Sequence, residues 1–113
     1  MKIVNLGVIS LMAASGIAHA DDASIQHGHQ VFDKWCAPCH GVGNNYPGTN
    51  ALRVKYKGAL PSALEQRTDL TADAVKLIVR HGVSIMAPFR KTEISDAELA
   101  DLAAYIARNT KKK

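Results

Sequence analysis

Three stretches of the chain place apolar side chains at the spacing of an α-helix. The first begins where Ser24 can cap a helix, and its apolar face then recurs at i, i+3, i+4 and i+7. Those positions are Gly28, Val31, Phe32 and Trp35. The pattern predicts a helix over residues 24–35 with one face packed against a core.

The second stretch has a recognisable start and end. Thr71 is a good N-cap with Asp73 in the first turn, and Gly82 stops the helix after a basic last turn. The apolar stripe between these ends consists of Val75, Ile78 and Val79. We therefore expect a second helix that ends just before Gly82.

The third stretch opens with a capping box. Ser95 and Glu98 stand three positions apart, and Arg108 closes the segment. The apolar residues between them follow at helical spacing and are Leu99, Leu102, Ala103 and Ile106. This pattern predicts the last helix of the fold.

Residues 41–61 interrupt these patterns with repeated glycine, proline and asparagine, and no alternating strand pattern appears there. A short helical turn is predicted around 62–67, with Pro61 near its start. The predicted fold class is all-α, with three or four helices and a long irregular middle. A loop of that length is unusual in so small a domain, so we expect something apolar inside the fold.

The composition fits one small folded domain. The chain has 113 residues, of which 47% are hydrophobic and 21% charged, so it is not a wholly disordered chain. The formal net charge of +4 is a mild excess of basic residues. We therefore expect no nucleic acid among its partners.

Residues 1–20 have the pattern of a signal peptide. A basic start precedes an apolar stretch over 3–14, and the segment closes with Ala18-His19-Ala20. A membrane anchor is the alternative, but the apolar stretch carries polar residues and is short for a bilayer span of about 20 residues. We therefore expect cleavage after Ala20. The mature domain, 21–113, is expected to be soluble and periplasmic, with no stable membrane anchor.

The segment Cys36-Ala37-Pro38-Cys39-His40 has the spacing of the attachment signature for c-type haem. Two thiols three positions apart on a helical turn can each add to one vinyl group, giving two thioether bonds. The histidine that follows is then held beneath the iron, where its imidazole supplies an axial ligand. The motif predicts one covalent haem c, attached at Cys36 and Cys39, with His40 as an iron ligand.

Three other interpretations of the cysteines are weaker. A thioredoxin-like redox pair needs a βαβ context, which is missing. A structural zinc site needs a second pair of ligands, and the chain has only two cysteines. A simple disulfide leaves His40 unexplained.

Met86 is the expected second axial ligand, because it is the only methionine after residue 20. Its segment, 82–89, is turn-like and can fold back over the haem face opposite His40. Filling of the core is the alternative role for a lone methionine, but the pairing of histidine with methionine is common at haem iron. The rival ligands are the other histidines after residue 20, namely His27, His29 and His81. The first two precede the motif on its own helix, and the third ends a helix, so all three are poorly placed.

With Cys36–His40 and Met86 in place, the chain after residue 20 resembles the class I cytochromes c over essentially its whole length. The resemblance implies the class I cytochrome c fold, with helices wrapped round one covalent haem. It also implies that the first and last helices cross where Gly28, Phe32 and Tyr105 meet. A residue without a side chain allows that close approach.

The resemblance further implies that the carbonyl of Pro47 accepts the Nδ1 proton of His40 and so fixes the orientation of the ring. The order Pro47-Gly48 departs from the common Gly-Pro order of the family. The segment Met86-Ala87-Pro88 likewise departs from the common Met-Pro.

Within the family, segments 64–70, 79–82 and 89–96 are similar to small cytochromes that serve flavin-dependent dehydrogenases, such as p-cresol methylhydroxylase. The resemblance implies a one-electron carrier rather than an enzyme. Its donor would be a flavin-dependent dehydrogenase, and its acceptor an oxidase or another cytochrome of the respiratory chain. Basic residues are expected around the exposed haem edge, and Arg53 or Arg67 is a candidate to neutralise a haem propionate. The candidates for the edge are Arg53, Lys55, Lys57, Arg90 and Lys91.

The alternative function is a haem-based ligand sensor or a peroxidase-like enzyme in which Met86 is displaced from the iron. A peroxidase needs an acid/base group beside the haem, and the sequence does not supply that arrangement. Ready binding of carbon monoxide by the reduced protein would distinguish this alternative from a carrier.

Overall fold

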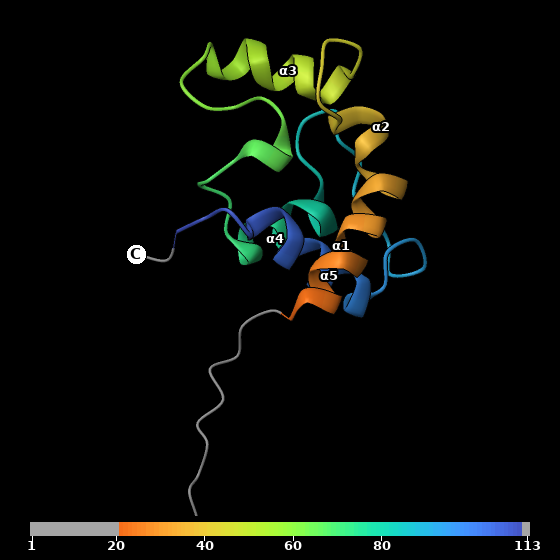
Figure 1. The fold of residues 1–113 in the computed structure, drawn as a ribbon. Helices are drawn as coiled ribbons and strands as arrows, with labels where there is room; N and C mark the ends of the chain where they lie inside the picture. The colour runs from red at the N-terminus through yellow and green to blue at the C-terminus, as the bar shows by residue number, and fades with distance from the viewer. Residues whose placement is uncertain (1–20, 112–113) are drawn as a thin grey trace, which may run out of the picture.

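The computed structural model describes residues 21–111, which contain five α-helices and one 3₁₀ turn joined by loops (Figure 1). The helices are α1 (Asp22–Trp35), α2 (Ala37–His40), α3 (Pro47–Tyr56), α4 (Ala72–His81) and α5 (Asp96–Ala107), and the 3₁₀ turn is η1 (Leu64–Gln66). These residues form no strand beyond an isolated bridge between Val83 and Met86. The predicted all-α fold class is confirmed.

Helices α1 and α5 cross and bury the core between them (Figure 1). Gly28 of α1 is buried against the backbone of α5. Phe32 packs on Tyr105 with ring centroids 5.7 Å apart, and Leu102 is fully buried beside them. This arrangement confirms the helix crossing that the family resemblance implies.

Helices α4 and α5 pack together and have the ends that the sequence predicts. The Thr71 hydroxyl accepts a hydrogen bond from the Ala74 N–H at 3.2 Å, and Gly82 is the C-cap of α4. At the start of α5, Glu98 accepts from the Ser95 N–H at 2.7 Å, while the Ser95 hydroxyl accepts from the Glu98 N–H at 3.2 Å. Each bond satisfies a backbone donor that the helix itself leaves unpaired.

Helix α3 lies inside the segment 41–61, for which the sequence predicted no regular structure, and that prediction is wrong. Pro47 occupies the first helical position, where its missing N–H is not needed and its fixed φ suits the helix. Residues 51–56 then continue the helix until Lys57, whose φ of 47° is left-handed, ends it. With α3 included, the described residues hold five α-helices, one more than the three or four expected.

Helix α1 also starts earlier than predicted. The Asp21 carboxylate accepts the Ser24 N–H at 2.8 Å, so Asp21 is the N-cap and Ser24 lies within the first turn. A carboxylate at this position satisfies an unpaired N–H and also stabilises the positive end of the helix dipole. The short turn predicted around 62–67 is present as η1.

The predicted signal peptide, 1–20, and the cleavage after Ala20 lie outside the described residues. Within residues 21–111, no helix has the length and apolar character needed to cross a membrane.

Candidate functional site

A cavity of about 340 Å³ lies beside the Cys-x-x-Cys-His motif. This volume falls in the usual range for small-molecule sites, about 300–1,000 Å³. Its lining comes from the end of α1, from α2, α3, α4 and α5, from η1 and the residues after it, and from the segment that follows α4. Most of the lining is apolar, including Leu52, Leu64, Val75, Ile78, Val79 and Phe89. The apolar group that the sequence led us to expect inside the fold therefore has a place.

Both cysteines line this cavity from one turn of helix. The Cys36 carbonyl accepts the N–H groups of Cys39 and His40 at 3.1 Å and 2.8 Å, which closes the turn that carries all three side chains. Cys36 is 7% exposed, and burial raises the pKa of its thiol to about 12. Cys39 is exposed, and the two sulfurs form no disulfide.

His40 lies at the end of α2 and also lines the cavity. Burial lowers the pKa of its imidazole, which favours the neutral ring that binds a metal. Its Nδ1 is buried and has no hydrogen-bond partner among the described residues. Gly48, at the start of α3, lies directly against the ring. Pro47 therefore adjoins the residue in contact with His40, but the hydrogen bond expected from its carbonyl is not formed in this structure.

Met86 lines the same cavity from a tight turn. The Met86 N–H donates to the Val83 carbonyl at 2.9 Å, and the Val83 N–H donates to the Met86 carbonyl at 3.0 Å. Ser84, between them, has a left-handed φ of 53°. The turn thereby brings the thioether of Met86 to the cavity that Cys36, Cys39 and His40 share.

Arg67 is a buried cation in the cavity wall, and its guanidinium is held by two neighbours. Its Nε and Nη2 donate to the two carboxylate oxygens of Asp69, each at 2.6 Å, and its guanidinium carbon lies 4.7 Å from the ring centroid of Tyr56. These hydrogen bonds hold the pKa of Asp69 below its usual value and raise that of Arg67. Arg67 is 3% exposed. Of the two arginines considered for a propionate, Arg53 and Arg67, it is Arg67 that lines the cavity.

The rival histidines lie away from the cavity. The Nδ1 of His27 is 2.7 Å from a carboxylate oxygen of Asp101, and the His29 ring stacks on Tyr105 with centroids 4.8 Å apart. His81 bonds to a carbonyl of its own helix. Of the histidines within residues 21–111, His40 is the one that lines the cavity.

The basic residues expected around the cavity are not equivalent in the structure. Lys55 lines the cavity from α3. Arg53 donates instead to the Asn50 side chain at 2.6 Å, and Arg90 and Lys91 pair with acidic neighbours. Of the five basic residues expected around the haem edge, Lys55 is the one that lines the cavity.

Two contacts near the motif were not found from the sequence. The buried Thr49 hydroxyl donates to the Gly41 carbonyl at 2.7 Å and ties α3 to the end of α2. Arg67 and Asp69 form the ion pair described above. The only sequence signal for that pair was the opposite charge of two residues two positions apart, and charge alone does not indicate burial.

The residues of the cavity fit a haem. They provide two thiols on one helical turn, an imidazole with a buried unpaired nitrogen, a thioether and an apolar lining. Among the described residues that line the cavity there is no carboxylate and no histidine besides His40. Residues 21–111 also contain no cluster of three or more side chains suited to holding a free metal ion.

Comparison with known proteins gives a consistent result. Residues 23–106 match the family described as cytochrome c oxidase, cbb3-type, subunit III. The cytochrome c6 of Cyanidioschyzon merolae is 31% identical over 90 residues, covering 80% of this chain and 79% of the relative. The cytochrome c6 of Picosynechococcus sp. is 34% identical over 106 residues, covering 92% and 88%. No solved structure matches the chain with significance.

Both kinds of match span most of the chain, including the haem-attachment motif and the segment that carries Met86. The chain therefore belongs to the class I-like cytochrome c family, as an electron-transfer protein with covalently bound haem c rather than an enzyme.

Proposed function

We propose that this protein is a periplasmic one-electron carrier in which Cys36 and Cys39 attach the haem and His40 and Met86 bind its iron. The observation that carries the proposal is that all four side chains line one apolar cavity. When bound, haem c supplies a one-electron couple between ferrous and ferric iron. By filling both axial positions, His40 and Met86 leave no open site for a substrate.

The surrounding residues set the conditions for that role. Burial favours the neutral His40 ring, whose Nδ1 is unpaired in the structure, and the Pro47 carbonyl is proposed to accept the Nδ1 proton once the haem is bound, which leaves the other nitrogen for the iron. The apolar lining excludes water, and the Met86 thioether favours the reduced state, so both raise the reduction potential. Arg67 is proposed to neutralise a haem propionate at the cavity wall.

The edge of the cavity is the proposed site of electron exchange with partner proteins. Ile85 is 93% exposed at the tip of the Met86 turn, Val83 is half exposed beside it, and Lys55 contributes a positive charge from α3. An edge with a few exposed apolar side chains suits a small, short-lived interface of the kind that redox partners form. We propose a flavin-dependent dehydrogenase as the donor, and an oxidase or another cytochrome as the acceptor. The predicted signal at 1–20 is the basis for the periplasmic location.

The ligand assignment is tested by optical spectroscopy of the purified holoprotein. An alkaline pyridine spectrum should report a haem with both vinyl groups saturated. The ferric protein should show the weak red band of a thioether–iron bond, and the ferrous protein should not bind carbon monoxide. Met86→Ala should keep the covalent haem, lose the red band, bind carbon monoxide and have a lower reduction potential.

Ile85→Ala is the matched control, because Ile85 precedes Met86 in the same turn but is exposed. It should retain the red band and exclude carbon monoxide. A Met86→Ala protein with an unchanged red band would show that another residue binds the iron. The donor is tested separately by comparing how fast flavin-dependent and flavin-free dehydrogenases reduce the wild-type protein.

A further inference from the structure

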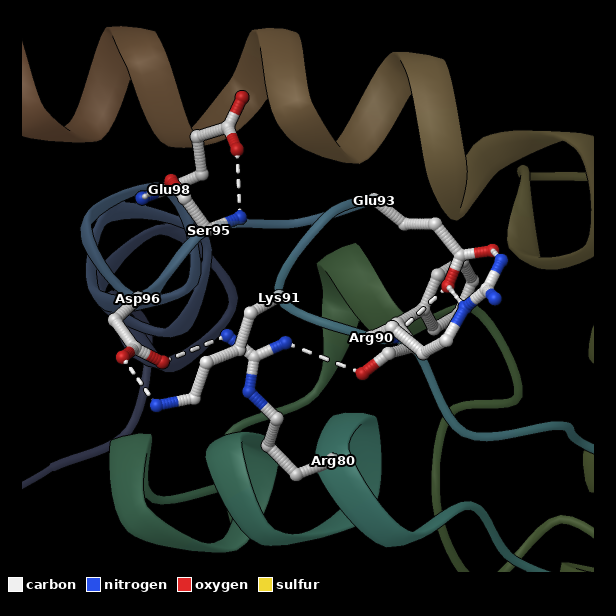
Figure 2. A network of polar contacts seen from close by, with 8 residues as sticks. Arg80, Arg90, Lys91, Glu93, Ser95, Asp96 and Glu98 are labelled. Atoms are coloured by element: carbon white, nitrogen blue, oxygen red, sulfur yellow. Dashed lines mark hydrogen bonds and ion pairs between the residues drawn. The ribbon is translucent and has the colours of Figure 1, made fainter.

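Arg80 joins three parts of the fold that meet next to the Met86 turn. It stands in the last turn of α4. Its Nη1 donates to the Phe89 carbonyl at 3.2 Å, and its Nη2 donates to a carboxylate oxygen of Asp96, the first residue of α5, at 2.9 Å. Figure 2 shows the Arg80 and Lys91 side chains both reaching the Asp96 carboxylate, with Lys91 on its second oxygen at 2.8 Å.

Phe89 is fixed by its backbone and by its ring. Its N–H donates to the Val79 carbonyl at 2.8 Å, so two consecutive residues of α4 bind the two backbone polar groups of Phe89. Its ring packs edge-on against Trp35, with centroids 5.8 Å apart. Phe89 is thereby an anchor between α4 and the end of α1.

This anchor lies three residues after Met86. The Met86 backbone is bonded to Val83 on one side, and on the other side only Ala87 and Pro88 separate it from Phe89. Proline fixes its own φ, which leaves little freedom in so short a connection. The position of Phe89, which is bonded to Val79 and Arg80 of α4, therefore restricts where the Met86 side chain can lie.

We propose that Arg80 is a positioning residue for Met86, acting through the Phe89 carbonyl and Asp96; the proposal rests on the proposed role of Met86 as an iron ligand. The side chain of Arg80 is only 18% exposed and its hydrogen bond to the Phe89 carbonyl is part-buried, whereas the Asp96 side chain is 65% exposed. A part-buried hydrogen bond to a charged group is stronger than an exposed ion pair, so the bond to the Phe89 carbonyl carries most of the effect.

The neighbouring Arg90 provides a matched control. It carries the same charge and lies in the segment between α4 and α5 that holds Met86 and Phe89, but its side chain is 79% exposed and pairs with Glu93, three residues on (Figure 2). Loss of Arg90 removes a surface ion pair without releasing Phe89. A general effect of removing one positive charge near the haem should therefore be equal in the two variants.

The test measures how readily imidazole displaces Met86 from the ferric holoprotein. Arg80→Leu should accelerate imidazole binding about tenfold, which corresponds to about 1.4 kcal/mol, and should weaken the red thioether band. Arg90→Leu should change the rate by less than about twofold, because exposed ion pairs contribute little. Arg80→Lys, which keeps the charge without the two-pronged donor, should fall between wild type and Arg80→Leu.

Hydrogen exchange gives a second readout that does not depend on the iron. Exchange at the Met86 and Phe89 amides should be faster in Arg80→Leu than in wild type, and unchanged in Arg90→Leu. If Arg80→Leu does not fold, Arg80→Lys carries both measurements.

The outcomes separate the two proposals. A wild-type protein without the red band overturns the ligand role of Met86 and the role of Arg80 with it. A wild-type protein with the band, combined with imidazole rates in both Arg80 variants equal to those of Arg90→Leu, overturns the role of Arg80 alone. A lower unfolding midpoint with unchanged imidazole binding identifies Arg80 as purely structural and also overturns the proposal.

Discussion

Gly28 of α1 lies so close to Asp101 of α5 that a Cβ at position 28 would be 2.1 Å from the Asp101 carbonyl oxygen. Gly28→Ala should therefore lower the free energy of unfolding by about 1–3 kcal/mol, because the helices must move apart. Helix propensity alone predicts the opposite sign, a gain of about 1 kcal/mol. Urea unfolding of the holoprotein decides between them, and an unchanged or higher stability would contradict the tight crossing.

Gly48 is in similarly close contact with His40. A Cβ at position 48 would lie 2.7 Å from Cε1 and 2.9 Å from Nδ1 of the His40 ring, and 2.8 Å from the Cys39 carbonyl oxygen. Gly48→Ala should displace the ring, with an overpacking cost of about 1–3 kcal/mol. We expect shifted NMR signals of the His40 ring protons and an altered reduction potential.

Gly28→Ala is the control for this effect, because it disturbs the helix crossing without touching the cavity. It should lower stability and leave the His40 signals in place. Identical His40 signals in Gly48→Ala and wild type would show that the ring does not depend on this contact.

Asp69 should make stability depend on acid pH. Its hydrogen bonds with Arg67 hold its pKa below the usual 3.8, so its contribution is complete above that value and is lost as pH falls through the folded-state pKa. Asp69→Asn should lower stability at pH 7 by about 1 kcal/mol, since the carboxylate is partly exposed to solvent. Below the folded-state pKa of Asp69 the variant and the wild type should converge. Parallel curves of unfolding free energy against pH would argue against the pair.

Attachment of the haem should be required for folding. Without haem, the apolar side chains that line the cavity, among them Leu52, Val75 and Val79, would face water and lose the burial that stabilises them. A small domain has only about 5–15 kcal/mol of stability in total. The Cys36→Ser/Cys39→Ser variant should therefore give little native helix by circular dichroism. Cys39→Ser, which keeps one attachment point, should remain largely helical, and a native spectrum in the double variant would contradict this prediction.

The elements that could be predicted from the sequence are those whose signals are local. The Thr71 cap, the Ser95–Glu98 capping box and the Gly82 stop each lie within a few residues of the helix end that they define, and all three are present. Helix α3 was missed because its first turn, 47–50, consists of residues typical of loops. Proline is favoured at the first position of a helix, so Pro47 is compatible with a helix start. Proline, glycine and asparagine are equally common in loops, however, and the sequence alone does not distinguish the two.

The residues of the site and its surroundings also divide into those with a local sequence signal and those without one. The spacing of Cys36, Cys39 and His40 is local, and Met86 could be proposed by elimination. Arg80 and Phe89 are nine residues apart, and the bond between them depends on how the chain turns back after α4. The pair between His27 and Asp101 spans 74 residues. Such contacts follow from the packing of helices, which a periodic pattern alone does not specify.

The unequal burial of the two thiols gives the haem an inner and an outer attachment. Cys36 is 7% exposed, whereas Cys39 is exposed, and both line the cavity. If haem is joined to both sulfurs as proposed, the link at Cys36 would lie inside the fold and the link at Cys39 would lie at its surface. Solvent and partner proteins would then meet the pigment from the Cys39 side first.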